Sequence, residues 1–166
     1  MDRTSPDIKA LRIRPVEAAN IADLIQIGEE ANLSHWSAQN YLDEMKNPAS
    51  IMLRLVDDEN STHGFVVGRI IPGGLIESIL EAEIYNIAVV SKQQGIGRGQ
   101  MLFDAFRDAC ILQKAANIWL EVRESNAKAI SFYERNGFKR VQTRNHFYDN
   151  PREHALLMKL EINDPR

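Results

Sequence analysis

The sequence predicts an α+β protein with a mixed, mostly antiparallel central sheet flanked by about four helices. Its first half contains apolar runs separated by short, turn-rich segments, a pattern typical of antiparallel hairpins. Its second half alternates strand-like and helix-like segments, which indicates strand–helix–strand crossovers. A chain of 166 residues fits one domain, in which folding buries roughly 70% of the surface of the unfolded chain.

The N-terminal segment divides into a polar arm and a first strand. Residues 1–10 are polar and contain proline, so we expect a flexible arm before a single domain that spans residues 11–166. Apolar and polar residues alternate over residues 11–16, which predicts a short strand. Pro15 should end this strand or place it at a sheet edge.

Two helices and three strands follow. Apolar residues recur at helical spacing over residues 17–31, and a second, shorter helix is expected between Ser37, whose hydroxyl can cap it, and Pro48. The three strands, joined by short loops, are expected at residues 51–56, 65–71 and 82–90.

The pattern changes after these strands. A glycine-rich turn at residues 94–99 leads into a helix with one apolar stripe. A strand is expected at residues 118–123, and a helix at residues 127–136 should end at Gly137. Two closing strands are expected at about residues 138–143 and 154–162.

Composition limits the classes of partner. The chain has 20 basic and 23 acidic residues, and this net charge of −3 argues against direct binding to nucleic acid but not against a basic peptide. A single cysteine forms no internal disulfide, which indicates a reducing compartment. The chain has neither an apolar run of about 18–20 residues nor an apolar signal-peptide core at its start, so we expect a cytoplasmic protein without a membrane span.

The glycine-rich turn has two interpretations. Alternating glycines at positions 95, 97 and 99 allow close approach of a ligand, and the amides at a helix start suit a pyrophosphate. The alternative is a flexible turn before a helix. A Walker loop is excluded because no Gly-Lys-Ser/Thr follows, and a dinucleotide fingerprint is disfavoured because Gln100 occupies the position of its third small residue.

Several motifs resemble those of a known family. Gln94-Gly95-Ile96-Gly97-Arg98-Gly99 resembles the Gln/Arg-x-x-Gly-x-Gly/Ala motif of the GNAT acetyltransferase superfamily. Residues 85–138 closely resemble the RimI-like branch, the ribosomal-protein alanine N-acetyltransferases, as do residues 144–148 and 152–155. His35-Trp36-Ser37 also resembles that branch, which usually has proline before the tryptophan. The resemblance is strong over about half of the chain and loose over the first 80 residues.

This resemblance implies a GNAT fold and a reaction. The chain would transfer acetyl from acetyl-CoA to a protein N-terminal amine, with the N-terminal alanine of a small-subunit ribosomal protein as the expected acceptor, by direct attack in a ternary complex. Two alternatives remain open: a lysine or small-amine acetyltransferase of the same fold, and a non-catalytic sensor that binds acyl-CoA.

The resemblance also implies the cofactor-binding residues. The main chain of Ile87, Ala88 and Val89 would pair with the pantetheine arm, and the Val89 N–H could serve the oxyanion. The pyrophosphate would be held by Gln94, Gly95, Ile96, Gly97, Arg98, Gly99 and Gln100. Gln100 departs from the basic residue often present there, and the neighbouring Lys92 and Arg98 could compensate.

Glu121 is the candidate general base. On the strand at residues 118–123, alternation places Glu121 on the face opposite Leu120. From the residues alone, a surface carboxylate paired with Arg123 is an equal alternative. The resemblance favours the base, because RimI-like enzymes carry theirs at the matching position.

Tyr133 is the candidate general acid for the departing thiolate. Its helical spacing lets the ring face the interior while the hydroxyl reaches a polar site, although a core anchor is the alternative. The match of Phe132-Tyr133-Glu134 to the family favours the acid. Asn126 could cap the following helix, but the resemblance implies contact with coenzyme A, and we expect Ser125 to be the cap.

Other chemistry is not favoured. Cys110 lies on an apolar helix stripe, which indicates a buried structural thiol. The four histidines lack metal-ligand spacing, so no metal site is expected. Trp36, Tyr41 and Tyr148 could line the entrance for the peptide, with ordinary packing as the alternative.

Overall fold

The computed structural model describes residues 10–74 and 78–162, so the arm expected at residues 1–10 lies almost wholly outside the described residues. Within these ranges, seven strands hydrogen-bond in the order β1-β2-β3-β4-β5-β7-β6. Strands β4 and β5 pair in parallel, whereas β1 with β2, β5 with β7, and β6 with β7 pair antiparallel. The α+β class with a mixed, mostly antiparallel sheet is therefore confirmed.

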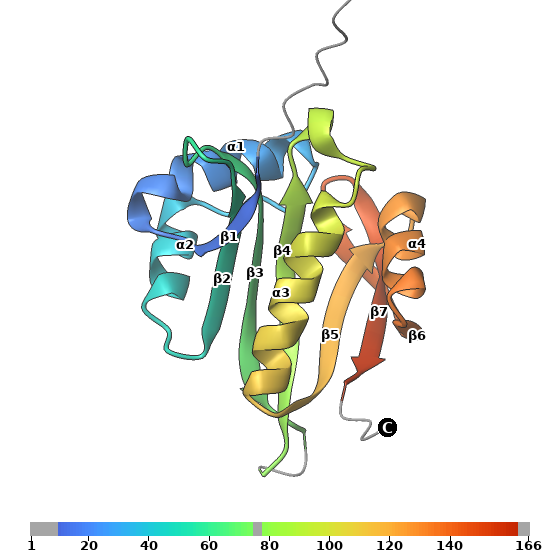
Figure 1. Cartoon of the computed structure of the whole chain (residues 1–166). Coiled ribbons are helices and arrows are strands. Elements are labelled where there is room, and N and C mark those ends of the chain that lie inside the picture. The colour runs from blue at the N-terminus through green and yellow to red at the C-terminus, as the bar shows by residue number, and fades with distance from the viewer. Residues whose placement is uncertain (1–9, 75–77, 163–166) are drawn as a thin grey trace, which may run out of the picture. The chain divides into compact units, whose positions relative to one another are not determined.

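The elements follow the predicted order along the chain (Figure 1). They are β1 (Arg12–Pro15), the 3-10 turn η1 (Ala18–Asn20), α1 (Ile21–Glu30), α2 (Ala38–Met45), β2 (Ser50–Val56), β3 (Thr62–Pro72), β4 (Leu80–Val89), η2 (Ser91–Gln93), α3 (Arg98–Leu112), β5 (Ala115–Arg123), α4 (Ala127–Arg135), β6 (Lys139–Asp149) and β7 (Arg152–Glu161).

Local signals in the sequence fix two helix ends. The Ser37 hydroxyl accepts a hydrogen bond from the Asn40 amide at 3.1 Å and caps α2, as predicted. Gly137, which follows the C-cap residue Asn136 of α4, adopts a φ of +92°, the left-handed conformation that ends a helix.

The last hairpin is longer than predicted. Strand β6 continues to Asp149, beyond the expected end at residue 143. Its side chains are nearly all exposed, so no apolar alternation marks the strand. Backbone pairing with β7 holds it instead, with register shifts between Arg140 and Gln142 and between Arg144 and Tyr148.

The chain divides into two compact units. The first unit comprises Met1–Val67 and Asn86–Phe106, and the second comprises Gly68–Tyr85 and Arg107–Arg166. The largest fully buried side chains of the first unit include Phe65, Phe103, Phe106, Leu24 and Leu55; those of the second are Ile118, Leu120 and Met158. Each such side chain stabilises its unit by roughly 1.5–3 kcal/mol relative to an exposed position.

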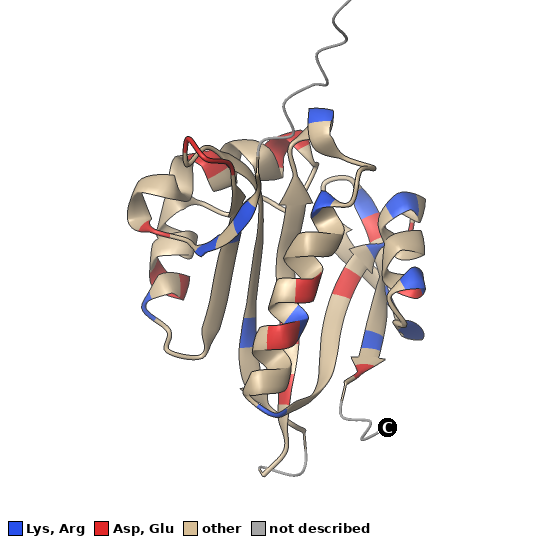
Figure 2. Ribbon diagram, viewed as in Figure 1, with Lys and Arg blue, Asp and Glu red and all other residues tan. Residues whose placement is uncertain are grey.

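Charges of both signs are interspersed along the helices and strands of each unit (Figure 2). This distribution fits a chain with 20 basic and 23 acidic residues. In the described part of the chain, no helix combines the length and apolar character needed to cross a bilayer.

Gly64 on β3 lies at a position that has no room for a side chain. A Cβ placed there would lie 2.8 Å from the Ala88 carbonyl oxygen and 2.9 Å from Leu102 Cδ1, closer than real contacts allow. The absence of a side chain at Gly64 thus lets the end of β4 and the start of α3 approach β3 within the first unit.

We expect Gly64→Ala to lower the free energy of unfolding by about 1–3 kcal/mol, because the backbone must shift to accept the methyl group. Gly28→Ala is the matched control: its Cβ would meet only ordinary contacts, the nearest at 3.8 Å. Inside α1, alanine should stabilise by up to about 1 kcal/mol. Urea unfolding measures both, and equal stability of the Gly64→Ala and unsubstituted proteins would contradict the packing argument.

Candidate active site

The glycine-rich loop of the first unit exposes backbone amides at a helix start. Gly95 and Gly97 have φ angles of +76° and +87°, which L side chains rarely adopt. The Met101 amide donates to the Gly97 carbonyl at 3.1 Å and opens the hydrogen-bonding of α3. The amides of the first turn have no acceptor within the helix, and the helix dipole makes this end partly positive. The arrangement suits a diphosphate.

Gln94 ties the loop to the end of β4. Its side-chain Nε2 donates to the Val89 carbonyl at 3.1 Å, within the segment expected to pair with pantetheine. The next residue, Val90, donates its amide to the His63 carbonyl at 2.9 Å. Gln100 is engaged on α3 itself, where its Nε2 donates to Asp104 Oδ1 at 2.9 Å. Arg98, which lies between Gly97 and Gly99, is the basic residue within residues 94–99.

Glu121 of the second unit lies on β5 with its side chain only 15% exposed. Its Oε1 lies 2.6 Å from Arg144 Nη1 on β6. Burial raises the pKa of Glu121, and the Arg144 cation opposes that rise. The alternation predicted for β5 is confirmed, since Leu120 and Val122 are buried. The alternative pairing of Glu121 with Arg123 is wrong.

Sequence reasoning missed a second carboxylate and the cation. Glu83 on β4 faces the same group of charges: its pKa is raised by burial and by Glu121, and lowered by Arg144 and Arg69. Arg144 therefore neutralises part of the charge of two partly buried carboxylates, Glu83 and Glu121. Alternation along β4 could have placed Glu83 on one face, but no local pattern links Arg144 to β5, because β7 lies between β5 and β6.

Tyr133 is buried on α4 and held by aromatic neighbours. It is 7% exposed, and its ring centroid lies 5.5 Å from those of Phe132 and Phe138. Burial raises the pKa of Tyr133, and the neighbouring Tyr148 raises it further. The hydroxyl therefore keeps its proton through neutral pH.

Tyr148 links these groups within the second unit. Burial and the Glu121 charge raise the pKa of Tyr148, while Arg123 lowers it. The Arg123 guanidinium lies 4.2 Å from the centre of the Tyr148 ring and donates to the Pro151 carbonyl at 3.0 Å. Glu153 accepts from Arg123 at 3.5 Å and from the Ser125 amide at 2.6 Å. The second unit thus brings Glu121, Tyr133 and Tyr148 together.

Asn126, not Ser125, caps α4. Asn126 Oδ1 accepts from the Ala129 amide at 3.1 Å, so the expected assignment of the cap to Ser125 is wrong. Ser125 instead gives its amide to Glu153. The physical reason is where the helix begins. Since α4 starts at Ala127, Asn126 is the residue directly before the helix, and its side chain reaches the amide of Ala129. The cap uses Oδ1 alone, and Nδ2 is a separate donor.

The remaining candidates lie in the first unit or in α3. Tyr41 is 2% exposed, with Trp36 and Phe65 as ring neighbours at 5.2 and 6.1 Å, and burial raises its pKa to about 12. Cys110 is buried, as predicted, and burial raises the pKa of its thiol to about 12. No group of three or more potential metal ligands occurs among residues 10–74 and 78–162.

Comparison with known proteins identifies the family. Residues 19–138 match the model of the acetyltransferase (GNAT) family. The [ribosomal protein bS18]-alanine N-acetyltransferase of Haemophilus influenzae is 31% identical over 149 residues, 88% of this chain and 95% of that protein. An N-alpha-acetyltransferase of Sulfurisphaera tokodaii is 29% identical over 90% of this chain and 92% of its own length.

A solved structure agrees with these relatives. The crystal structure of the ribosomal-protein-S18-alanine N-acetyltransferase from Escherichia coli superposes with a TM-score of 0.80 at 26% identity, covering 95% of this chain and 97% of that one. The chain belongs to the GNAT acetyltransferase family and is an acetyl-CoA-dependent N-acetyltransferase.

Proposed function

We propose that this enzyme acetylates the N-terminal α-amine of a protein, and that the acceptor is the terminal alanine of a small-subunit ribosomal protein. The names of the relatives from Haemophilus influenzae and Escherichia coli support this acceptor. The observation that carries the proposal is the largely buried carboxylate of Glu121, whose pKa is raised by burial. A ribosomal acceptor would place the reaction in the cytoplasm.

A modest base suffices for this acceptor. An α-amine has a pKa of about 8, against about 10.4 for lysine, so its deprotonation near neutral pH costs roughly 3 kcal/mol less. A carboxylate with a raised pKa is a stronger proton acceptor than an exposed one. The ion pair with Arg144 keeps Glu121 ionised and therefore able to accept the proton.

Acetyl-CoA supplies the thioester whose acetyl group is transferred. The two left-handed glycines and the helix start suit its diphosphate, with Gln94–Gln100 as the proposed binding residues. The proposed pantetheine contacts come from the backbone of Ile87, Ala88 and Val89, with Asn126 Nδ2 as a further donor.

The proton balance assigns one role to each group. The amine attacks the thioester carbonyl in its neutral form, after the ammonium has lost a proton to water, and the nitrogen then transfers one proton to Glu121 while the Val89 N–H stabilises the oxyanion. The carbon–sulfur bond then breaks, and the sulfur receives a proton from Tyr133. The products are the acetylated N-terminus and coenzyme A, with one proton gained by Glu121 and one lost by Tyr133.

A peptide panel tests the acceptor. One peptide begins with a free alanine and contains an internal lysine, and its control has the same sequence with a blocked N-terminus. After incubation with acetyl-CoA, mass spectrometry should find one acetyl group, on the alanine amine of the first peptide only. Acetylation of lysine in the control would indicate the lysine alternative, and binding of acetyl-CoA without turnover on either peptide would indicate a sensor.

Tyr133→Phe should lower kcat by about 10²-fold or more, because the thiolate then leaves without its proton donor. The affinity for coenzyme A, measured by calorimetry, should stay unchanged, and so should the unfolding midpoint, since the phenyl ring keeps its aromatic neighbours. A kcat near that of the unsubstituted enzyme would refute the role of Tyr133 as acid.

Arg144→Gln should move the acidic limb of the pH profile of kcat/KM to higher pH. Arg144 lowers the pKa of Glu121, so its removal raises that pKa, and the base form is then populated only at higher pH. Arg140→Gln is the control on the same strand, because Arg140 pairs with Glu134 at 2.8 Å. If both variants keep the original limb, Glu121 is not the titrating base.

A further inference from the structure

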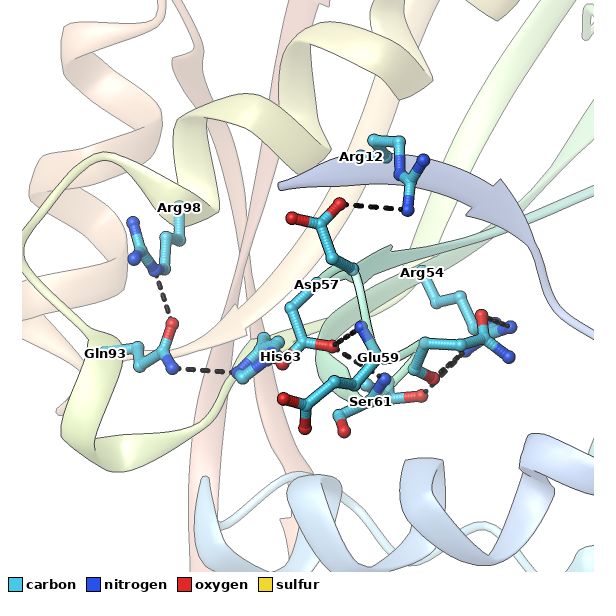
Figure 3. A network of polar contacts seen from close by, with 11 residues as sticks. Arg12, Arg54, Asp57, Glu59, Ser61, His63, Gln93 and Arg98 are labelled. Carbon is cyan, nitrogen blue, oxygen red and sulfur yellow. Dashed lines mark hydrogen bonds and ion pairs between the residues drawn. The ribbon is translucent and has the colours of Figure 1, made fainter. Parts of the chain in front are cut away.

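A chain of polar side chains runs to the glycine-rich loop inside the first unit (Figure 3). It begins at Asp57, which follows β2, passes through His63 on β3 and Gln93 in η2, and ends at Arg98, the first residue of α3. The side chains of Asp57 and His63 are 4% and 18% exposed.

Asp57 is the fixed end of this chain. Its Oδ1 accepts from the backbone amides of Glu59 and Ser61, each at 3.0 Å, which holds the carboxylate in the turn after β2. Its Oδ2 lies 2.9 Å from His63 Nε2. The hydrogen bond with His63 is the largest of the effects that lower the pKa of Asp57.

The hydrogen bonds have one consistent direction. The Asp57 carboxylate only accepts, so His63 Nε2 carries the hydrogen, and Nδ1 is then an acceptor for Gln93 Nε2 at 2.8 Å. Because the Gln93 amide donates through its own Nε2 to His63, its Oε1 is turned toward Arg98 and accepts from Arg98 Nε. Since both ring nitrogens of His63 are engaged, the imidazole acts on orientation and not on a reacting atom.

Arg98 is the residue on which this orientation acts. It lies between Gly97, with its left-handed backbone, and Gly99, so its own segment offers little to fix the side chain. Arg98 contacts Gln93 through Nε. Its two terminal guanidinium nitrogens are therefore further donors, in a forked geometry that matches phosphate oxygens. A cation held in place before binding loses less side-chain entropy when the ligand arrives.

We propose that Asp57 and His63 are positioning residues for cofactor binding, which orient Arg98 through Gln93 toward the diphosphate of coenzyme A. The inference rests on the proposed use of the Gln94–Gln100 loop as the diphosphate site. It adds Asp57, in the turn after β2, and His63 on β3, both of which lie outside the family motif. The orientation of the loop cation then depends on a buried carboxylate that is distant in the sequence.

The test compares variants by calorimetric titration with coenzyme A and by steady-state kinetics with acetyl-CoA and the alanine peptide. His63→Leu should raise the Kd for coenzyme A and the KM for acetyl-CoA about five- to twentyfold, with kcat at saturation within about twofold. His63→Gln should restore most of the affinity, because its amide can donate to Asp57 and accept from Gln93 in the same direction.

A double-mutant cycle separates positioning from stability. In an Arg98→Ala background, His63→Leu should have no further effect on the Kd, because the residue through which it acts is gone. Arg12→Gln is the matched control. Arg12 is drawn near these hydrogen-bonded side chains in Figure 3 but pairs with the exposed Asp58 at 3.1 Å, so its substitution should leave the Kd unchanged.

The outcomes are distinct. Wild-type protein that fails to bind coenzyme A would overturn the proposed use of the loop and this inference with it. Wild-type binding with an unchanged Kd in His63→Leu would overturn the inference alone. It would also be overturned if His63→Gln binds as poorly as His63→Leu, or if the effect of His63→Leu persists in the Arg98→Ala background.

Discussion

The proposed binding of the cofactor depends on the start of α3. A diphosphate needs several donors that point one way, and a helix start offers them only if the chain before it turns sharply. Gly95 and Gly97 provide that turn through positive φ angles, and Gln94 fastens it to the Val89 carbonyl. Gly64 serves the same end, because a side chain there would collide with the Ala88 carbonyl.

In the proposed reaction the second unit has a different task, which is to hold the proposed base, Glu121, and the proposed acid, Tyr133, in suitable protonation states near neutral pH. Burial and Arg144 act on the pKa of Glu121 in opposite directions, so the carboxylate is more basic than an exposed one yet remains ionised. Burial, and to a smaller extent Tyr148, raises the pKa of Tyr133, which keeps its proton near neutral pH. Tyr148 interacts electrostatically with both and is held by Arg123.

Short-range signals made most of the fold predictable. Ser37 and Gly137 marked helix ends through local hydrogen bonding and backbone conformation, and alternation on β5 placed Glu121 on the correct face. Long-range pairings were not predictable. Arg144 reaches Glu121 across β7, and Asp57 reaches Arg98 through two intermediates on other elements, so no periodic pattern encodes either contact. The cap at Asn126 was misassigned because two adjacent polar residues can both cap in principle.

A crystal structure with bound acetyl-CoA tests the central claim most directly. We expect diphosphate oxygens within hydrogen-bond distance of the amides between Gly95 and Gln100, with the Arg98 guanidinium beside them and its Nε still bonded to Gln93. A diphosphate bound elsewhere, with the glycine loop contacting no part of the cofactor, would contradict it.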